Sequence, residues 1–241
     1  MKVVFAIDAL EHKLVEEFET ENLKQKYYGR TNISEFSEPR TMVLWSSFMT
    51  GENKETEVLE LGDKAMWDKK WGIEDTFFSE FENPKILDLP GFSYDLEAHK
   101  KSRELLKSFF ESEDSEDKKQ IKKEYNQDAF EHHKKVKKQF LNSLDKDHDF
   151  VLGYFSVADV IGHLNFGNKT MMKMIYTDLD EIADELKNRE KITDLIVLSD
   201  HGMKAIGNFG DHSTYGFWST NFKDLNTPKI TDFSEIIKNR I

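Results

Sequence analysis

Two adjacent side chains that can bind a metal ion, Asp200 and His201, directly follow a run of apolar residues. The run, residues 195–198, is typical of a strand that is buried on both faces of a parallel sheet. Gly202 lets the chain turn away, and open α/β sheets place their chemistry at the carboxyl ends of strands. A carboxylate oxygen and an imidazole nitrogen suit a divalent cation. A solvated turn is the alternative, since Asp, His and Gly are common in loops.

The same order of strand and then carboxylate occurs twice more. Residues 2–7 form an apolar run that ends at Asp8, and residues 150–157 form another that precedes Asp159. His163 lies four residues after Asp159, and side chains with that spacing can share one side of a helix. A glycine-rich segment near the C-terminus adds one more histidine. The candidate metal ligands are therefore Asp8, Asp159, His163, Asp200, His201 and His212.

Three carboxylates and three imidazoles are enough for two metal sites with three protein ligands each. Three protein ligands and an open position are the pattern of a catalytic metal site. Two metal ions about 4 Å apart can clamp the attacking and leaving oxygens of a phosphoryl group. Histidines supply half of the ligands, which favours zinc, with manganese second.

Such a site needs a nucleophile, and Thr41 is the candidate. It begins a predicted helix, which ends before Gly51, and the free N–H groups of a helix N-terminus attract an anion. The threonine hydroxyl would then attack phosphorus. The alternative role for Thr41 is simple N-capping of the helix.

The remaining pattern predicts an α/β fold. Strands expected near residues 2–7, 83–91, 150–157 and 193–199 alternate with predicted helices, which indicates a mainly parallel central sheet flanked by helices. Residues 27–40 are polar and are interpreted as a loop, and residues 207–216 as a glycine-rich loop. The other predicted helices are residues 10–18, 168–187 and a C-terminal segment within 230–241.

A region of different composition, residues 52–144, interrupts this pattern. Residues 96–144 are rich in Lys and Glu, contain no Pro or Gly, and space their apolar residues as in one or two long helices with a break in 111–119. A coiled-coil arm is the alternative, but its heptads are irregular. We expect one α/β catalytic domain, residues 1–241, with an inserted cap at 52–144 that sets substrate specificity. Its aromatic cluster could line the substrate or form local core: Trp67, Trp71, Phe77 and Phe78.

Composition excludes several classes of function. The net charge of −12 argues against a nucleic-acid polymer as main partner. With no cysteine, disulfides, thiolate metal sites and cysteine nucleophiles are excluded. The first apolar run is too short for a signal peptide, and no stretch approaches the roughly 20 apolar residues of a membrane helix. We expect a cytoplasmic protein with a small phosphorylated substrate and no membrane partner, and its oligomeric state stays open.

Taken in order, these residues resemble the motifs of the alkaline phosphatase superfamily, and most closely its type I phosphodiesterase/nucleotide pyrophosphatase branch. The resemblance extends from residue 8 to residue 212 and implies an alkaline phosphatase-like core. The segments that carry it are Asp8, Thr41 ahead of Thr50-Gly51, Asp159-x-x-x-His163, Ser199-Asp-His-Gly-Met203 and His212.

The resemblance also implies roles for these residues. Asp8, Asp200 and His201 would hold the metal ion that activates Thr41. A second metal ion, serving the later attack by water, would be held by Asp159, His163 and His212. The implied activity is hydrolysis of phosphodiesters or pyrophosphates through a covalent phosphothreonine.

Other activities remain alternatives at this point. A phosphomonoesterase or phosphomutase could use the same metal core, and a catalytically silent relative could keep the metals for structure. Sulfatases of the superfamily carry a modified Cys or Ser in place of Thr41, so the threonine and the lack of cysteine argue against that activity. The family usually continues after Thr-Gly with a Pro, a His-Gly turn and an asparagine that steadies the phosphate. Residues 51–57 do not keep this pattern, so that role is unassigned.

The other histidines are not expected to take part in catalysis. His132 and His133 lie in a Lys- and Glu-rich stretch and are predicted to be solvated. His12, His99 and His148 lie in polar stretches without a partner at a matching spacing.

Overall fold

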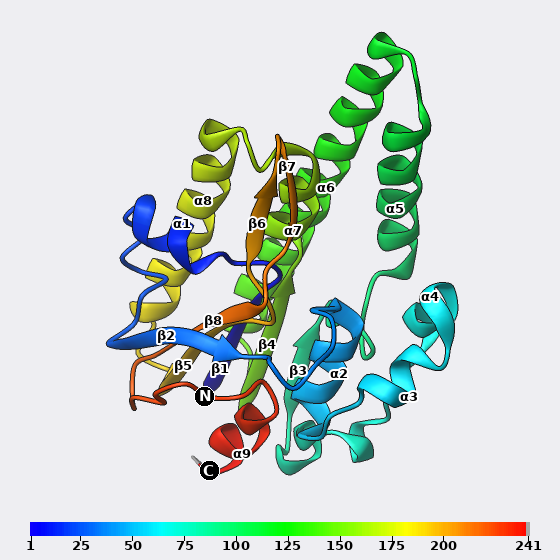
Figure 1. Ribbon diagram of the computed structural model, residues 1–241. Coiled ribbons are helices and arrows are strands. Elements are labelled where there is room, and N and C mark those ends of the chain that lie inside the picture. Colours follow the sequence, from blue (N-terminus) through cyan, green and yellow to red (C-terminus); the bar gives the residue numbers. More distant parts are fainter. Residues whose placement is uncertain (240–241) are drawn as a thin grey trace.

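The computed structural model describes residues 1–239. Its centre is a six-stranded sheet with the order β2-β8-β5-β1-β4-β3 (Figure 1). β5, β1, β4 and β3 are parallel, β8 is antiparallel to β5, and β2 is antiparallel to β8. The predicted mainly parallel α/β sheet is therefore confirmed. The strands are β1 (Lys2–Ile7), β2 (Tyr27–Asn32), β3 (Pro84–Leu87), β4 (Phe150–Phe155), β5 (Asp194–Ser199) and β8 (Tyr215–Thr220).

Both faces of the sheet are buried. Successive side chains of a strand point to opposite faces, so each strand contributes to two cores. In β1, Val4 and Ala6 belong to one apolar core, whereas Val3 and Phe5 belong to the other. The first core packs against α2 (Thr41–Thr50) and α9 (Asp232–Lys238). The second packs against α1 (His12–Glu17), α7 (Val157–Asn165), α8 (Lys169–Lys187) and the C-terminal part of α6 (Ser115–Ser143).

Two glycines explain how helices meet their neighbours. Gly51 ends α2 in the left-handed conformation, at φ 74°, as the sequence predicted. Gly153 lies in β4 beneath α6, where a Cβ atom would come within 2.4 Å of the Phe140 ring. The missing side chain therefore allows α6 to lie directly on the sheet.

The region predicted to form one or two long helices forms two. α5 (Leu96–Glu111) and α6 form an arm that projects beyond the sheet (Figure 1). The break between them is residues 112–114, where the Asp114 side chain accepts the N–H groups of Glu116 and Asp117 and so caps α6. The base of the arm belongs to the core through Val136 and Phe140.

The rest of residues 52–95 combines short elements with one strand of the main sheet. β3 pairs in parallel with β4, so this part of the expected cap contributes to the central sheet itself. The short elements before it are α3 (Glu55–Leu59), α4 (Gly62–Ala65) and the 3-10 helices η1 (Met66–Asp68), η2 (Ile73–Asp75) and η3 (Phe77–Glu80).

Two segments predicted as loops are strands. Residues 27–40 contain β2, an edge strand whose polar side chains hide the pattern, because only its backbone pairing with β8 makes it a strand. Residues 207–216 contain part of a hairpin made by β6 (Met203–Ile206) and β7 (Phe209–His212), with Gly207 at φ 61° in its turn. The predicted C-terminal helix is α9, and the end of its expected range, residues 240–241, lies outside the described residues.

Two histidines on α6 are not solvated as predicted. His132 Nε2 lies 2.6 Å from Asp88 Oδ2, and His133 Nε2 lies 2.6 Å from Asp178 Oδ2. Both carboxylates come from distant segments, which the local composition of α6 does not indicate.

None of the described helices combines the length and the apolar character that crossing a membrane requires.

Candidate active site

The three carboxylates predicted to follow strands lie at one edge of the sheet. β5, β1 and β4 are neighbours, and their register pairs Ile7 with Phe155 and Ala6 with Leu198, so the three strands end side by side. Asp8 follows β1 and Asp200 follows β5, whereas Asp159 is in the first turn of α7. All six predicted ligands are brought into this one region.

Asp8, Asp200 and His201 form one cluster, in which one ligand atom from each lies within 4.8 Å of the others. His201 Nε2 is 3.3 Å from Asp8 Oδ1 and 3.4 Å from Asp200 Oδ2. The Tyr154 hydroxyl donates to Asp8 Oδ2. Asp8 Oδ1 and both Asp200 oxygens are buried and have no hydrogen-bond donor within residues 1–239.

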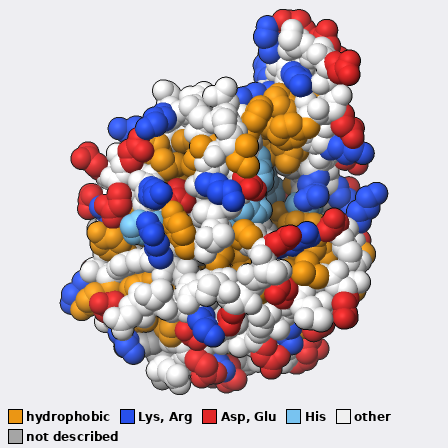
Figure 2. All heavy atoms as spheres, in the orientation of Figure 1, with side chains coloured by type: hydrophobic (Ala, Val, Ile, Leu, Met, Phe, Trp, Pro, Cys, Tyr) orange, Lys and Arg blue, Asp and Glu red, His pale blue; other side chains and the backbone are white. Residues whose placement is uncertain are grey.

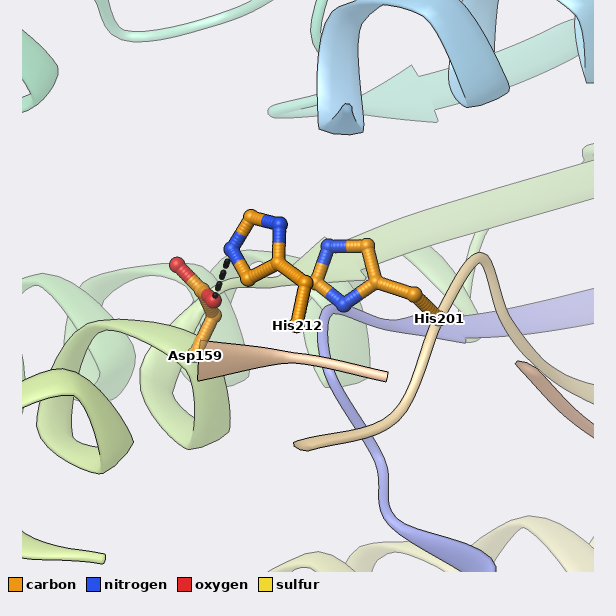
Figure 3. Close-up of side chains that lie close together, drawn as sticks. All are labelled: Asp159, His201 and His212. Carbon is orange, nitrogen blue, oxygen red and sulfur yellow. Dashed lines mark ion pairs between the residues drawn. The ribbon is translucent and has the colours of Figure 1, made fainter. Parts of the chain in front are cut away.

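Asp159 is the centre of the second cluster. Its Oδ1 atom lies 3.4 Å from His163 Nε2 and 3.3 Å from His212 Nε2. Figure 3 shows the His212 ring between Asp159 and His201, and the two rings are stacked with their centroids 3.9 Å apart. Asp159, His201 and His212 have ligand atoms within 4.8 Å of one another, so the two clusters adjoin through His201.

Each of the three imidazoles is held in the orientation of a metal ligand. Its Nδ1 atom lies close to a backbone carbonyl oxygen, which can only accept a hydrogen bond, so Nδ1 carries the hydrogen. The neutral ring then offers the Nε2 lone pair to a cation. The pairs are His163 with Gly210 (3.3 Å), His201 with Gly202 (3.0 Å) and His212 with Pro39 (2.7 Å).

The donor set fits divalent cations. Buried carboxylate oxygens without donors are costly, and three carboxylates this close repel one another. A cation among them would remove both costs. Imidazole nitrogen ligands suit zinc, and carboxylate oxygen ligands suit zinc and manganese.

Around Asp8, the neutral forms of the side chains are favoured. Burial raises the pKa of Asp8 well above its usual value, and the nearby Asp200 adds to this. Burial also raises the pKa of Asp200 to about 7. The pKa of His201 is lowered well below its usual value, first by burial, so this ring is neutral.

Around Asp159, the charged forms of the side chains are favoured. Burial acts to raise the pKa of Asp159, but the charges and hydrogen bonds of His163 and His212 together outweigh it and leave the pKa well below its usual value. Burial likewise opposes protonation of His212, yet its contact with Asp159 raises its pKa to about 9. The pKa of His163 is raised for the same reason. A bound cation would take the place of these protons.

Thr41 is not an N-cap. It is the first residue inside α2, and the N-cap is Arg40, which makes no side-chain capping bond. Thr41 is only 6% exposed, and its Oγ1 atom lies 3.4 Å from His201 Nε2. It lines a cavity of about 80 Å³ together with Asp8 and Asp159. A group in that cavity would touch the threonine hydroxyl and both ligand clusters.

Glu11 is a buried residue of the site that the sequence did not single out. Its Oε2 atom accepts the Met203 N–H at 3.1 Å and lies 3.4 Å from the Ser213 hydroxyl. Its Oε1 atom accepts the Tyr215 hydroxyl at 2.5 Å. These partners are about 190 to 200 positions away in the chain, so no local spacing marks them.

The predicted aromatic cluster divides between its two alternatives. Trp71, Phe77 and Phe78 are buried in the first core. Trp67 instead lines the cavity that holds Thr41.

Comparison with a protein-family model decides the family. The model of the type I phosphodiesterase / nucleotide pyrophosphatase family matches residues 3–222. The chain belongs to this family. Its members are phosphoric ester hydrolases, and the match spans all six predicted ligands and Thr41. The resemblance seen in the sequence is thus confirmed. A comparison with curated proteins gave no match.

Solved structures with a similar fold include alkaline phosphatases. The alkaline phosphatase from the Antarctic bacterium TAB5 has a TM-score of 0.56 and 13% identity, with 98% of this chain and 96% of that chain covered. A mutant of the TAB5 enzyme with Mg bound in its M3 site gives 0.59 and 13%, with 99% and 96% covered. At this identity the likeness shows the fold alone.

A longer relative is also similar. Murine ectonucleotide pyrophosphatase / phosphodiesterase 5 has a TM-score of 0.48 and 13% identity, with 86% of this chain covered. The chain spans 58% of the length of that protein.

Proposed function

We propose that this protein is a metal-dependent phosphohydrolase whose Thr41 hydroxyl attacks phosphoric esters of small molecules. The observation that carries the proposal is the position of Thr41. Its Oγ1 atom lies 3.4 Å from His201 Nε2 and opens into the same cavity as Asp8 and Asp159. Membership of the type I phosphodiesterase / nucleotide pyrophosphatase family supports it.

The six ligands divide between two divalent cations in this proposal. Asp8, Asp200 and His201 hold one, and the other is held by Asp159, His163 and His212. Zinc is favoured and manganese is second, because imidazoles supply half of the ligands. Bound there, the cations would lower the pKa of the Thr41 hydroxyl and neutralise charge that develops on the phosphoryl oxygens.

Thr41 and the N-terminus of α2 perform the first displacement. The free N–H groups of the first turn of α2 stabilise the phosphoryl oxygens. The Thr41 hydroxyl gives its proton to solvent, its oxygen forms a bond to phosphorus, and the bond from phosphorus to the leaving oxygen breaks. The leaving alcohol takes a proton from solvent. The product is a covalent phosphothreonine at residue 41.

Water completes the reaction in a second displacement. Its oxygen attacks phosphorus from the opposite side and gives a proton to solvent, the bond to Thr41 breaks, and the threonine oxygen takes a proton from solvent. Tyr154, which donates to Asp8, and the carbonyls that hold the three imidazoles keep the site in position through both steps.

Substrate choice is assigned to the cap in this proposal. The region 52–144 supplies Trp67 and part of α5 to the cavity, next to Thr41. We propose a small phosphorylated substrate in the cytoplasm, with no membrane or nucleic-acid polymer involved.

The test compares two aryl esters, bis(4-nitrophenyl) phosphate and 4-nitrophenyl phosphate, with wild type and Thr41→Ala. The wild type should release 4-nitrophenolate, and Thr41→Ala should lose several powers of ten in turnover, since the nucleophile is gone. Metal content and melting temperature should change little, because all six ligands remain. Wild-type turnover in Thr41→Ala would remove Thr41 from the mechanism. Hydrolysis of neither ester by the wild type would favour a silent metal-binding relative.

A further inference from the structure

One wall of the cavity is built by residues outside the metal ligands. Trp67 comes from η1, and His99 and Arg103 come from α5, where a spacing of four residues puts them on one side of the helix. The rings of Trp67 and His99 are in contact, with centroids 3.8 Å apart. The Arg103 guanidinium carbon lies 5.9 Å from the Trp67 ring centre.

Two polar atoms in this wall have no partner. Trp67 Nε1 and His99 Nε2 are buried and make no hydrogen bond to the described part of the chain. A buried polar group left in this state costs free energy, and a ligand bound in the cavity would remove that cost. An indole nitrogen can only donate a hydrogen bond, so the partner of Trp67 must be an acceptor.

The environment of His99 makes its free nitrogen a donor as well. The Tyr94 hydroxyl lies 3.1 Å from His99 Nδ1, its only hydrogen-bond partner among residues 1–239. We assign the tautomer in which the hydroxyl donates its proton to Nδ1. Burial lowers the pKa of His99, so the ring is neutral and carries its single hydrogen on Nε2.

Arg103 differs from the other cations of α5. Lys100, Lys101 and Lys107 each have an acidic side chain within 4.0 Å, at 3.9, 2.5 and 3.6 Å respectively. Arg103 has no such partner within the described residues, and its guanidinium faces Trp67 at the cavity. Figure 2 shows histidine side chains inside a hollow beside the arm, with Lys or Arg side chains next to it.

We propose that Trp67, His99 and Arg103 form an oxyanion subsite for a second anionic group of the substrate, a carboxylate or phosphate joined to the scissile phosphoryl group. The proposal rests on the proposed function, which puts that phosphoryl group beside Thr41. Three donors without an acceptor fit an oxyanion, and the planar guanidinium suits either group.

The size of the cavity limits the distance between the two groups. Its volume is only about 80 Å³, so the second anion would lie close to the phosphoryl group. A second cavity of about 290 Å³ shares Tyr94 and His99 with the first and offers room for the remainder of a substrate.

Phosphonates with a stable carbon–phosphorus bond test the subsite without turnover. Methylphosphonate provides the phosphoryl group alone, phosphonoacetate adds a carboxylate, and methylenediphosphonate adds a second phosphoryl group. Calorimetry on the metal-loaded wild type should show that one or both compounds with a second anionic group bind roughly 10-fold to 100-fold more tightly than methylphosphonate. The compound that gains more affinity shows whether the second group is a carboxylate or a phosphate. Ligand binding should also change the tryptophan fluorescence of the wild type more than that of Trp67→Phe.

Arg103→Gln should reduce that advantage to roughly 3-fold or less and leave methylphosphonate binding unchanged. Trp67→Phe keeps the ring but removes the N–H donor, and it should lower the advantage while metal content stays constant. Lys107→Gln is the matched control, because it removes one positive charge from an exposed side chain of the same helix. It should keep the full advantage.

Three results would overturn the subsite: no preference for a second anion in the wild type, equal weakening of all three phosphonates by Arg103→Gln, or an equal effect of Lys107→Gln. A protein that shows the preference but hydrolyses no ester would retain the subsite and lose the proposed function. A protein that hydrolyses esters but shows no preference for a second anion would retain the proposed function and lose the subsite.

Discussion

Glu11 Oε1 lies 2.5 Å from the hydroxyl oxygen of Tyr215, and this contact joins the loop after β1 to the start of β8. The other oxygen of the same carboxylate accepts the N–H of Met203, which follows the Asp200-His201 pair. Glu11 is 3% exposed. One buried side chain therefore fixes the relative positions of loops that carry candidate metal ligands from separate strands.

Replacing Glu11 should weaken metal binding without removing a ligand. Glu11→Gln keeps the size of the side chain but has one acceptor oxygen for three or more donors. We expect the metal affinity to fall roughly 10-fold to 100-fold and the stability to fall by about 1–3 kcal/mol. Metal titration and thermal unfolding measure these, and excess metal should restore most of the turnover. Glu16→Gln, at a more exposed carboxylate, is the control. Unchanged metal affinity in Glu11→Gln would refute a positioning role.

Metal removal should destabilise the protein as well as inactivate it. Three buried carboxylates that face one another lose their common partner when a chelator removes the ions. We expect two divalent ions per chain in elemental analysis, a lower melting temperature after chelation, and recovery of both stability and turnover on adding zinc or manganese. A protein without stoichiometric metal, or one whose melting temperature ignores the chelator, would contradict the two-metal proposal.

Serine at position 41 should preserve the chemistry that alanine abolishes. Thr41→Ser keeps the attacking hydroxyl at the start of α2 and is expected to retain turnover within roughly a factor of ten. Acid quenching during turnover should leave one phosphoryl group on the peptide that contains residue 41, in both wild type and Thr41→Ser. Mass spectrometry detects it. An active enzyme whose peptide never carries the group would exclude the covalent intermediate.

The buried ring of His99 should make stability depend on pH. Burial lowers its pKa from 6.5 to about 4, so between these values the unfolded chain binds more protons than the folded one. This contribution to the stability of the fold is fully present above the pKa of the unfolded chain and is lost as the pH falls towards 4. From about pH 7.5 to about pH 5 it amounts to about 2 kcal/mol.

Chemical denaturation at both pH values measures the effect. His99→Gln cannot gain this charge, so its stability should fall by about 2 kcal/mol less than that of the wild type over the same range. His148→Gln, at a histidine outside the cavity, should behave as the wild type does. Equal pH dependence in wild type and His99→Gln would show that His99 is not buried as a neutral ring.

Sequence alone was sufficient for the features that local patterns specify. Apolar runs that end in a carboxylate predicted β1 and β5 and put Asp8 and Asp200 at their ends. The four-residue spacing of Asp159 and His163 fits a helix, and both lie on α7. The spacing of apolar residues and the absence of Pro and Gly in 96–144 predicted one or two long helices. In each case the signal is hydrophobic periodicity or turn chemistry within a few residues.

Only the tertiary structure decided which residues meet across long stretches of chain. β2 is a strand because its backbone pairs with that of β8. The side chains of β2 do not show the alternation of apolar and polar residues that would predict this. Glu11 accepts hydrogen bonds from residues about 190 positions away or more. The donors of Trp67 and His99 lie close together because α5 packs against η1. Such contacts depend on how elements pack around the sheet, and burial and hydrogen bonding between distant residues leave no periodic trace in the sequence.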